Sequence, residues 1–158
     1  MVAILEKTQM RYFIINFIFV ILGLNCLAGS GPSYLKCKSE SGKTIFNAQL
    51  NNLDWGLESA EFIIDKFEIN FDFDDSASIV VDLDNGVYTL TIRSKEKEED
   101  GSSYFIKLWG IPSTFKAIIN ERNKIKYEFK AKIQGTDPRP DKKFSPTIEL
   151  NCTLEWEI

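Results

Sequence analysis

The chain has 158 residues, with 19 basic and 23 acidic side chains and no histidine. A net charge of −4 gives it no general attraction to nucleic acid or to an anionic membrane surface, so we expect no nucleic-acid partner. Without histidine, the usual general base, zinc ligand and catalytic-triad partner are all missing. The composition therefore argues against enzymes of those classes.

The N-terminal region is predicted to be a secretory signal rather than part of the fold. The apolar run YFIINFIFVILGL occupies residues 12–24, follows Arg11 and leads into NCLAGSG. A basic start, a short apolar segment and small residues before a cut are typical of a signal peptide, and the run is too short for a comfortable transmembrane helix. We expect a signal peptide over 1–28, with Met10 as an alternative start, and one exported domain over 29–158.

Cys26 supports a second interpretation, in which the leader ends in a lipid-attachment cysteine. The bacterial lipoprotein motif has small residues directly before the cysteine, whereas Leu24 and Asn25 stand there in this chain. A lipid anchor at Cys26 is therefore the less favoured alternative to simple secretion. Both routes place the domain in the periplasm or the extracellular space, without a transmembrane segment in the mature form.

Removal of the signal leaves two cysteines, Cys37 and Cys152, near opposite ends of the domain. Both lie in alternating segments, SYLKCKS and TIELNCTLEWEI, and both fall on the apolar face of their segment. In an oxidising compartment an isolated pair of cysteines is most simply a disulfide. We predict a bond that joins the first strand to the last. A redox-active thiol is disfavoured, because no CxxC motif or histidine accompanies either cysteine.

Apolar and polar residues alternate along most of the chain after residue 33, which is the pattern of strands with one buried face. A helical period is convincing only in the signal, although DWGLESAEF (54–62) would allow one helical turn. We therefore predict an all-β fold, a single antiparallel sandwich or closed barrel of about eight or nine strands. The clearest strand segments are 33–38, 46–50, 66–74, 78–93 (two strands), 104–109, 115–121, 124–134 and 147–158.

Two hairpins are predicted in more detail. Asn85-Gly86 separates two apolar runs and indicates a type I′ turn, because both residue types accept the positive φ that this turn requires. The last two strands pair best in the register in which partner numbers sum to 281, since opposite charges then face each other across the strands. The facing pairs are Lys132 with Glu149, Lys126 with Glu155, and Lys124 with Glu157.

The long turn 135–146 and the two Trp-Gly pairs are the candidate contact sites for a partner. Pro138 and Pro140 limit the flexibility of this turn and lower the entropic cost of binding. Exposed aromatic and arginine side chains are the usual anchors of protein interfaces. In the simpler interpretation these aromatic residues complete the core and the basic ones are solvated. The candidate partner-binding residues are Trp55, Trp109, Arg139, Lys142, Lys143 and Phe144.

The acidic run DFDDSASIVVDLDNG raises calcium as a weak alternative. An EF-hand loop has glycine at its sixth and glutamate at its twelfth position, but counting from Asp82 gives glycine at the fifth and Arg93 at the twelfth. A calcium site would instead need Asp72, Asp74 and Asp75 to converge with another loop. No other metal or cofactor is predicted.

Three function classes remain. The favoured one is a non-catalytic protein-binding module, of inhibitor, immunity or envelope accessory type, whose partner is another envelope or extracellular protein. A small-ligand carrier is the alternative and needs an internal cavity. A carboxylate-based hydrolase is the third, and it would need clustered carboxylates in a cleft.

Lysines at 124, 126, 130 and 132 are expected to form a solvated, self-neutralised face rather than a nucleic-acid site.

Overall fold

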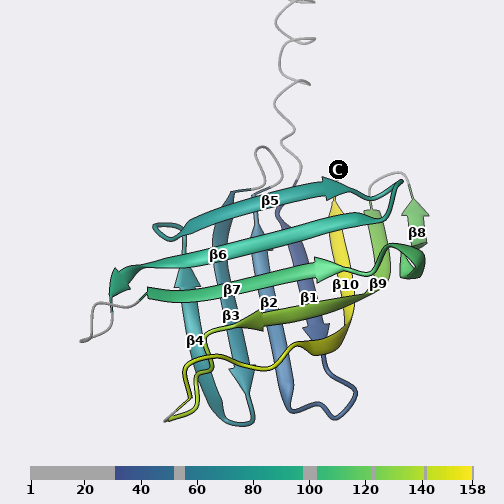
Figure 1. Cartoon of the computed structure of the whole chain (residues 1–158). Helices are drawn as coiled ribbons and strands as arrows, with labels where there is room; N and C mark the ends of the chain where they lie inside the picture. The colour runs from purple at the N-terminus through teal and green to yellow at the C-terminus, as the bar shows by residue number, and fades with distance from the viewer. Residues whose placement is uncertain (1–30, 52–55, 98–102, 122–123, 141, 158) are drawn as a thin grey trace, which may run out of the picture.

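The computed structural model describes residues 31–51, 56–97, 103–121, 124–140 and 142–157, whose strands form one antiparallel sheet (Figure 1). The order across the sheet is β4-β3-β2-β1-β10-β9-β7-β6-β5, and β8 pairs with β9 off this path. The prediction of an antiparallel all-β fold is confirmed, with ten strands in the described residues. These are β1 (Ser33–Lys38), β2 (Thr44–Leu50), β3 (Leu57–Ile64), β4 (Phe67–Asp72), β5 (Ser76–Asp82), β6 (Val87–Lys97), β7 (Ser103–Gly110), β8 (Lys116–Glu121), β9 (Lys124–Gly135) and β10 (Ile148–Glu157).

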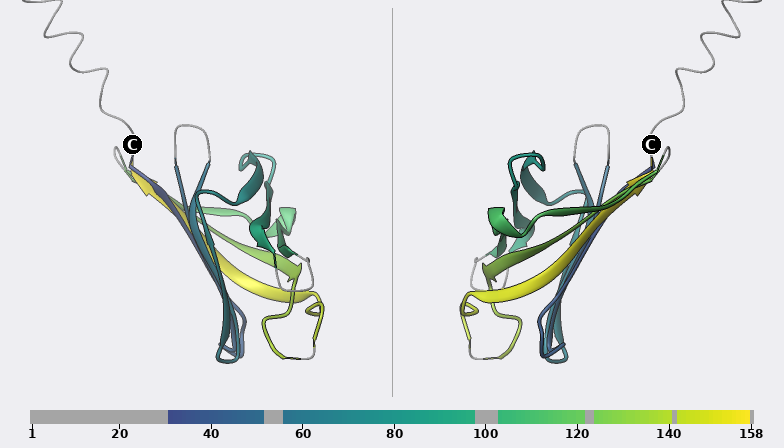
Figure 2. Two further views of the ribbon diagram at one scale, coloured as in Figure 1. Left: turned by 90° about the vertical axis from the view of Figure 1, so that its left-hand side faces the viewer. Right: turned by 90° about the vertical axis from the view of Figure 1, so that its right-hand side faces the viewer.

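The sheet curls strongly over its own inner face and forms a half-barrel (Figure 2). β1 to β4 make one wall, and β5 to β7 cross in front of them to make the other (Figure 1). The inner face carries the core, in which Phe46, Phe62 and Tyr88 are among the largest fully buried side chains. One curled sheet thus buries an apolar face against itself, as the two layers of a sandwich do.

β9 turns the sheet from one wall to the other by changing its partner halfway along. Its second half pairs with β7 and its first half with β8. Between the two, the backbone of Lys130 is satisfied by the short 3-10 helix η2 (Pro112–Thr114) and the residue before it. Ile111 N–H donates to the Lys130 carbonyl at 2.8 Å, and Lys130 N–H donates to the Thr114 hydroxyl at 2.9 Å. This exchange sets η2 and β8 beside β9.

The predicted disulfide lies on the inner face, between β1 and β10. Cys37 and Cys152 occupy directly opposite positions of this antiparallel pair, and their sulfur atoms are 2.09 Å apart. Both residues are buried, at 2% and 3% exposure. The structure therefore confirms that the first strand is bonded to the last.

The predicted register of the last hairpin is also confirmed, although its ion pairs differ. Every β9–β10 pair sums to 281, including Lys132 with Glu149. The cation bound to Glu149 is nevertheless Lys130, at 2.8 Å, and Glu155 lies 3.6 Å from Lys36 of β1. Long side chains reach diagonal neighbours as readily as direct ones, so the register does not fix the ion pairs.

The turn between β5 and β6 differs from the predicted type I′ turn. Asp82 pairs with Val87, which leaves a four-residue loop closed by a hydrogen bond from Gly86 N–H to the Leu83 carbonyl. Gly86 has positive φ, at 68°, whereas Asn85 does not, and the Asn85 amide instead binds the Asp82 carboxylate. Four-residue hairpin loops are most often built around a type I turn, and in this loop Gly86 alone has positive φ.

Over 57–62 the helical turn that the sequence allowed is not formed, because Leu57–Ile64 form β3; residues 54–55 lie outside the described residues. A bulge opposite Leu50 shifts the register there, so Glu58 and Ser59 are exposed in succession between buried Leu57 and Ala60. That spacing of three mimics a helical period. Residue 73 also departs from its pattern: β4 ends at Asp72, and Phe73 is 75% exposed in the following turn.

The predicted signal peptide, the alternative start at Met10 and the lipid-anchor candidate Cys26 lie outside the described residues. Along the described part of the chain, no helix has the length and apolar character needed to cross a membrane.

Replacing both Cys37 and Cys152 by alanine should lower the free energy of unfolding, since the bond closes a loop with a sequence separation of 115. The chain-entropy model gives a loss of about 4–5 kcal/mol, and measured losses are often smaller. Urea denaturation of the exported wild type and the double variant measures the difference. Mass spectrometry should show the wild type two hydrogens lighter than its reduced form; two free thiols, or equal midpoints, would contradict the assignment.

Candidate functional site

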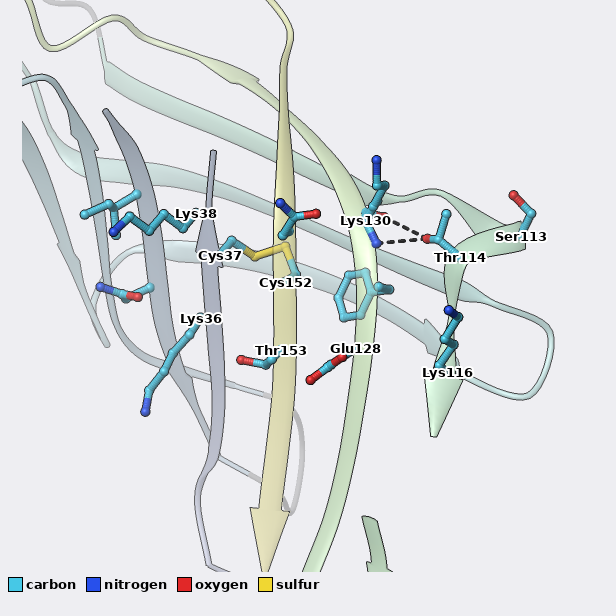
Figure 3. A pocket seen from close by; sticks show the side chains of 14 residues that line it. Lys36, Cys37, Lys38, Ser113, Thr114, Lys116, Glu128, Lys130, Cys152 and Thr153 are labelled. Atoms are coloured by element: carbon cyan, nitrogen blue, oxygen red, sulfur yellow. Dashed lines mark hydrogen bonds between the residues drawn. A yellow bond between two sulfur atoms is a disulfide. The ribbon is translucent and has the colours of Figure 1, made fainter. Parts of the chain in front are cut away.

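A groove of about 740 Å³ lies on the outer face of the sheet, over β2, β1, β10 and β9, with η2 and β8 along one side (Figure 3). We call it the lysine groove. Its lining carries more cations than anions, on a chain whose net charge is negative. The charged residues that define it are Lys36, Lys38, Lys116, Lys130 and Glu128.

The strand register explains why these side chains meet. Neighbouring residues of paired strands share a face of the sheet, so each cross-strand row presents one line of side chains. One outer row runs from Lys38 through Asn151 to Lys130. The next runs from Lys36 through Thr153 and Glu128 to Lys116. The disulfide and Phe129 form the inner row between them and support the floor of the groove from behind.

Two of the four lysines have acidic partners at the margin of the groove. Lys130 donates to Glu149 at 2.8 Å, and this hydrogen bond, with the charge of Glu149, raises the pKa of Lys130 and lowers that of Glu149. Lys36 lies 3.6 Å from Glu155. Exposed pairs of this kind contribute little free energy, so an incoming anion can compete with them.

Lys38 and Lys116 have no ion-pair partner among the described residues. Both side chains line the groove, from opposite sides (Figure 3). Asn151 and Thr153 of β10 add neutral hydrogen-bonding groups between them, and Ser113 of η2 adds another at the margin. The groove can therefore hold carboxylates by charge and hydrogen bonding.

A second hollow, of about 430 Å³, continues the same outer face over β1 to β4. Lys36 and Asn47 line both the lysine groove and this hollow, so the two depressions adjoin each other along the sheet. The side chains that line the second one include the polar residues Gln49, Glu61 and Asn70. Together they offer an extended ligand a longer surface than either does alone.

Within the predicted contact loop, Arg139 binds the loop itself. Its guanidinium donates to both carboxylate oxygens of Asp137, at 2.8 and 2.6 Å, and lies 3.6 Å from Asp65 in the turn between β3 and β4. The Asp137 side chain is fully buried, and the hydrogen bond from Arg139 lowers its pKa. Arg139 thus fastens the loop to the sheet, and a substitution there would disturb stability as well as any binding.

The other predicted anchors are dispersed. Lys142, Lys143 and Phe144 remain exposed in the loop, with Phe144 at 66%. Trp109 lies on β7 opposite Lys132, with the Lys107 ammonium 5.9 Å from its ring. Trp55 lies outside the described residues. The structure therefore does not assemble the five described residues into one site.

The three aspartates of the calcium alternative organise a turn. Asp72 accepts from the Asp74 amide at 2.9 Å, and Asp75 accepts from the backbone amides of Asp72 and Lys95, at 3.0 and 2.7 Å. Asp74 lies 3.4 Å from the Lys95 ammonium. Among the described residues no three acidic, cysteine or histidine side chains gather as metal ligands would.

The lysine groove was missed at the level of sequence, although part of its signal was present. Lys36 and Lys38 flank Cys37, so a buried Cys37 places both lysines on the outer face. The position of Lys116 depends on the partner exchange of β9, which alternation alone does not reveal.

Comparisons with models of known protein families, with curated proteins and with solved structures found no match to this chain.

The Asp137–Arg139 pair predicts a specific acid sensitivity. The pKa of Asp137 is lowered from 3.8, so its contribution to stability is complete above that pH and is lost as the pH falls through the folded-state pKa. Asp137→Asn should lower the melting temperature near neutral pH and flatten its decline below pH 3.8. Asp84→Asn, at an exposed position of the β5–β6 turn, is the matched control. Equal acid profiles for the wild type and Asp137→Asn would contradict the role of this pair.

Proposed function

We propose that this protein is an exported, non-catalytic binding module that holds an acidic segment of another extracytoplasmic protein in the lysine groove. The observation that carries the proposal is the charge of the lining: four lysines and one glutamate, on a chain with net charge −4. A locally positive groove on a negative protein favours an acidic ligand there and disfavours it elsewhere.

The construction of the groove supports binding of an extended segment. Its floor consists of paired strands, and the Cys37–Cys152 bond holds two of them together beneath the lysines. A site that is already ordered before binding loses less conformational entropy. The adjoining hollow over β1 to β4 extends the surface along the sheet.

The disulfide also supports the extracytoplasmic setting, because such bonds persist in oxidising compartments. The periplasm and the extracellular space both meet this requirement. A carrier function has less support, since large buried side chains such as Phe46, Phe62 and Phe129 occupy the inner face. A carboxylate-based hydrolase also has less support, because Glu128 is the one acidic residue among the described residues that line the lysine groove.

Titration with an oligoglutamate peptide tests the proposal, with binding followed by calorimetry. The Lys38→Glu/Lys116→Glu variant should bind about tenfold more weakly or worse, because each change replaces attraction by repulsion. Binding should also weaken as salt rises, since exposed charges are screened. An oligolysine peptide of equal length should not bind.

Lys142→Glu/Lys143→Glu is the matched control, because it changes the net charge equally in the predicted contact loop. This variant should keep most of the affinity for oligoglutamate. If it loses more affinity than the groove variant, the loop is the binding site. If the wild type does not bind oligoglutamate at low salt, the proposal fails.

A further inference from the structure

The edge strand β5 (Ser76–Asp82) is a surface whose role the groove does not explain. It ends the sheet and pairs with β6 alone. All seven of its residues are at least partly exposed, and Val80 in its centre is 56% exposed. Within the described residues, none of its backbone groups makes a hydrogen bond beyond its pairing with β6. One long side of β5 thus offers unpaired N–H and C=O groups.

β5 lacks the devices that commonly protect an edge strand. Proteins place charged residues, especially lysine, or proline along such strands to prevent pairing with other chains. The sequence SASIVVD has no lysine and no proline, and its single charge is the terminal Asp82. The opposite edge, β4, carries Glu68 and Asp72 and buries Ile69 and Phe71. The two ends of the sheet therefore differ in chemistry.

We propose that β5 pairs antiparallel with β5 of a second copy of this chain, about a twofold axis near Ile79. Every copy has a net negative charge, so a self-contact must be made where charge is sparse. In this arrangement the two Asp82 side chains lie about 20 Å apart along the strands, farther than the screening length at moderate salt. This proposal is independent of the lysine groove.

The strand behind β5 fits the same pairing. On the outer face, Ser78 and Val80 lie beside Thr91 and Thr89 of β6, which are uncharged. Arg93 lies beside Ser76, at the end of β5 away from Asp82. A twofold axis near Ile79 therefore sets Arg93 of each copy two strands, about 10 Å, from Asp82 of the other, so opposite charges lie near each other at both ends of the pairing.

Joining two edges in this way makes one continuous sheet across both copies. Backbone hydrogen bonds supply the affinity, and Val80 loses exposed surface. A single strand pair is a small interface, so we expect a weak dimer with a dissociation constant in the upper micromolar range or above.

Sedimentation of the exported protein over a wide concentration range, with hydrogen exchange at both extremes, tests the pairing. The expected result is a monomer–dimer equilibrium in which amides of Ser76–Asp82 gain protection at high concentration while those of Phe67–Asp72 do not. Val80→Lys should weaken dimerisation about tenfold or more, because a lysine then enters the interface from each copy.

Ile118→Lys is the matched control, because Ile118 is an apolar side chain, 49% exposed, on another edge strand, β8. It should leave the dimer unchanged. A wild-type monomer at every concentration overturns the proposal. A dimer in which amides outside β5 gain protection also overturns it. So does protection of β5 that appears only when a different protein is added. The exchange measurement on the wild type decides the case even if a variant fails to fold.

Discussion

The pairing of β1 with β10 holds together two sets of strands that are made from different parts of the chain. β1 to β4 follow one another across one wall, β5 to β7 make the other, and β9 turns the sheet between the two. β10, the last strand, lies between them and pairs with β9 on one side and β1 on the other. The disulfide crosses this joint, and the Arg139–Asp65 contact adds a second link between the long loop and the first wall. A bond between the first and last strands of the sheet stabilises it strongly, because the chain loop that the bond closes is long.

The lysine groove lies over this same joint, so the disulfide and the proposed binding site depend on the same pair of strands. Cys37 and Cys152 point inward from positions flanked by Lys36, Lys38, Asn151 and Thr153, which point outward. Any change that separates β1 from β10 therefore also separates the two sides of the groove floor. The β5 edge lies at the far end of the sheet order, four strands from β10. Binding at the groove and pairing at the edge can thus coexist on one molecule.

Much of the fold followed from the sequence because strict alternation identifies both the strands and their buried face. The disulfide and the 281 register followed for the same reason, since each depends on which side chains share a face. The errors arose where the backbone departs from regular pairing. The bulge opposite Leu50 disguised β3, and the loop between Asp82 and Val87 has four residues rather than the two of the hairpin turn that Asn85-Gly86 usually forms.

The candidate site was harder to predict than the fold, because it depends on contacts between segments distant in sequence. The sequence predicts Arg139 to be an exposed anchor, but its guanidinium binds the buried carboxylate of Asp137. Lys116 lines the groove because β9 changes its partner from β7 to β8. At the change, the Thr114 hydroxyl accepts the Lys130 N–H hydrogen bond that a neighbouring strand would otherwise accept. The alternation of apolar and polar residues indicates which side chains share a face of a strand. It does not indicate which strand lies beside it.

The most direct test of binding in the lysine groove is a nuclear magnetic resonance titration of the isotope-labelled exported protein with an oligoglutamate peptide. We expect the shifts to concentrate on amides of Lys36, Lys38, Asn151 and Lys116, which come from β1, β10 and β8 but meet at one groove. Residues of the 135–146 loop should shift little. Shifts centred on Lys142 to Phe144, or spread evenly over all exposed lysines, would contradict binding in the groove.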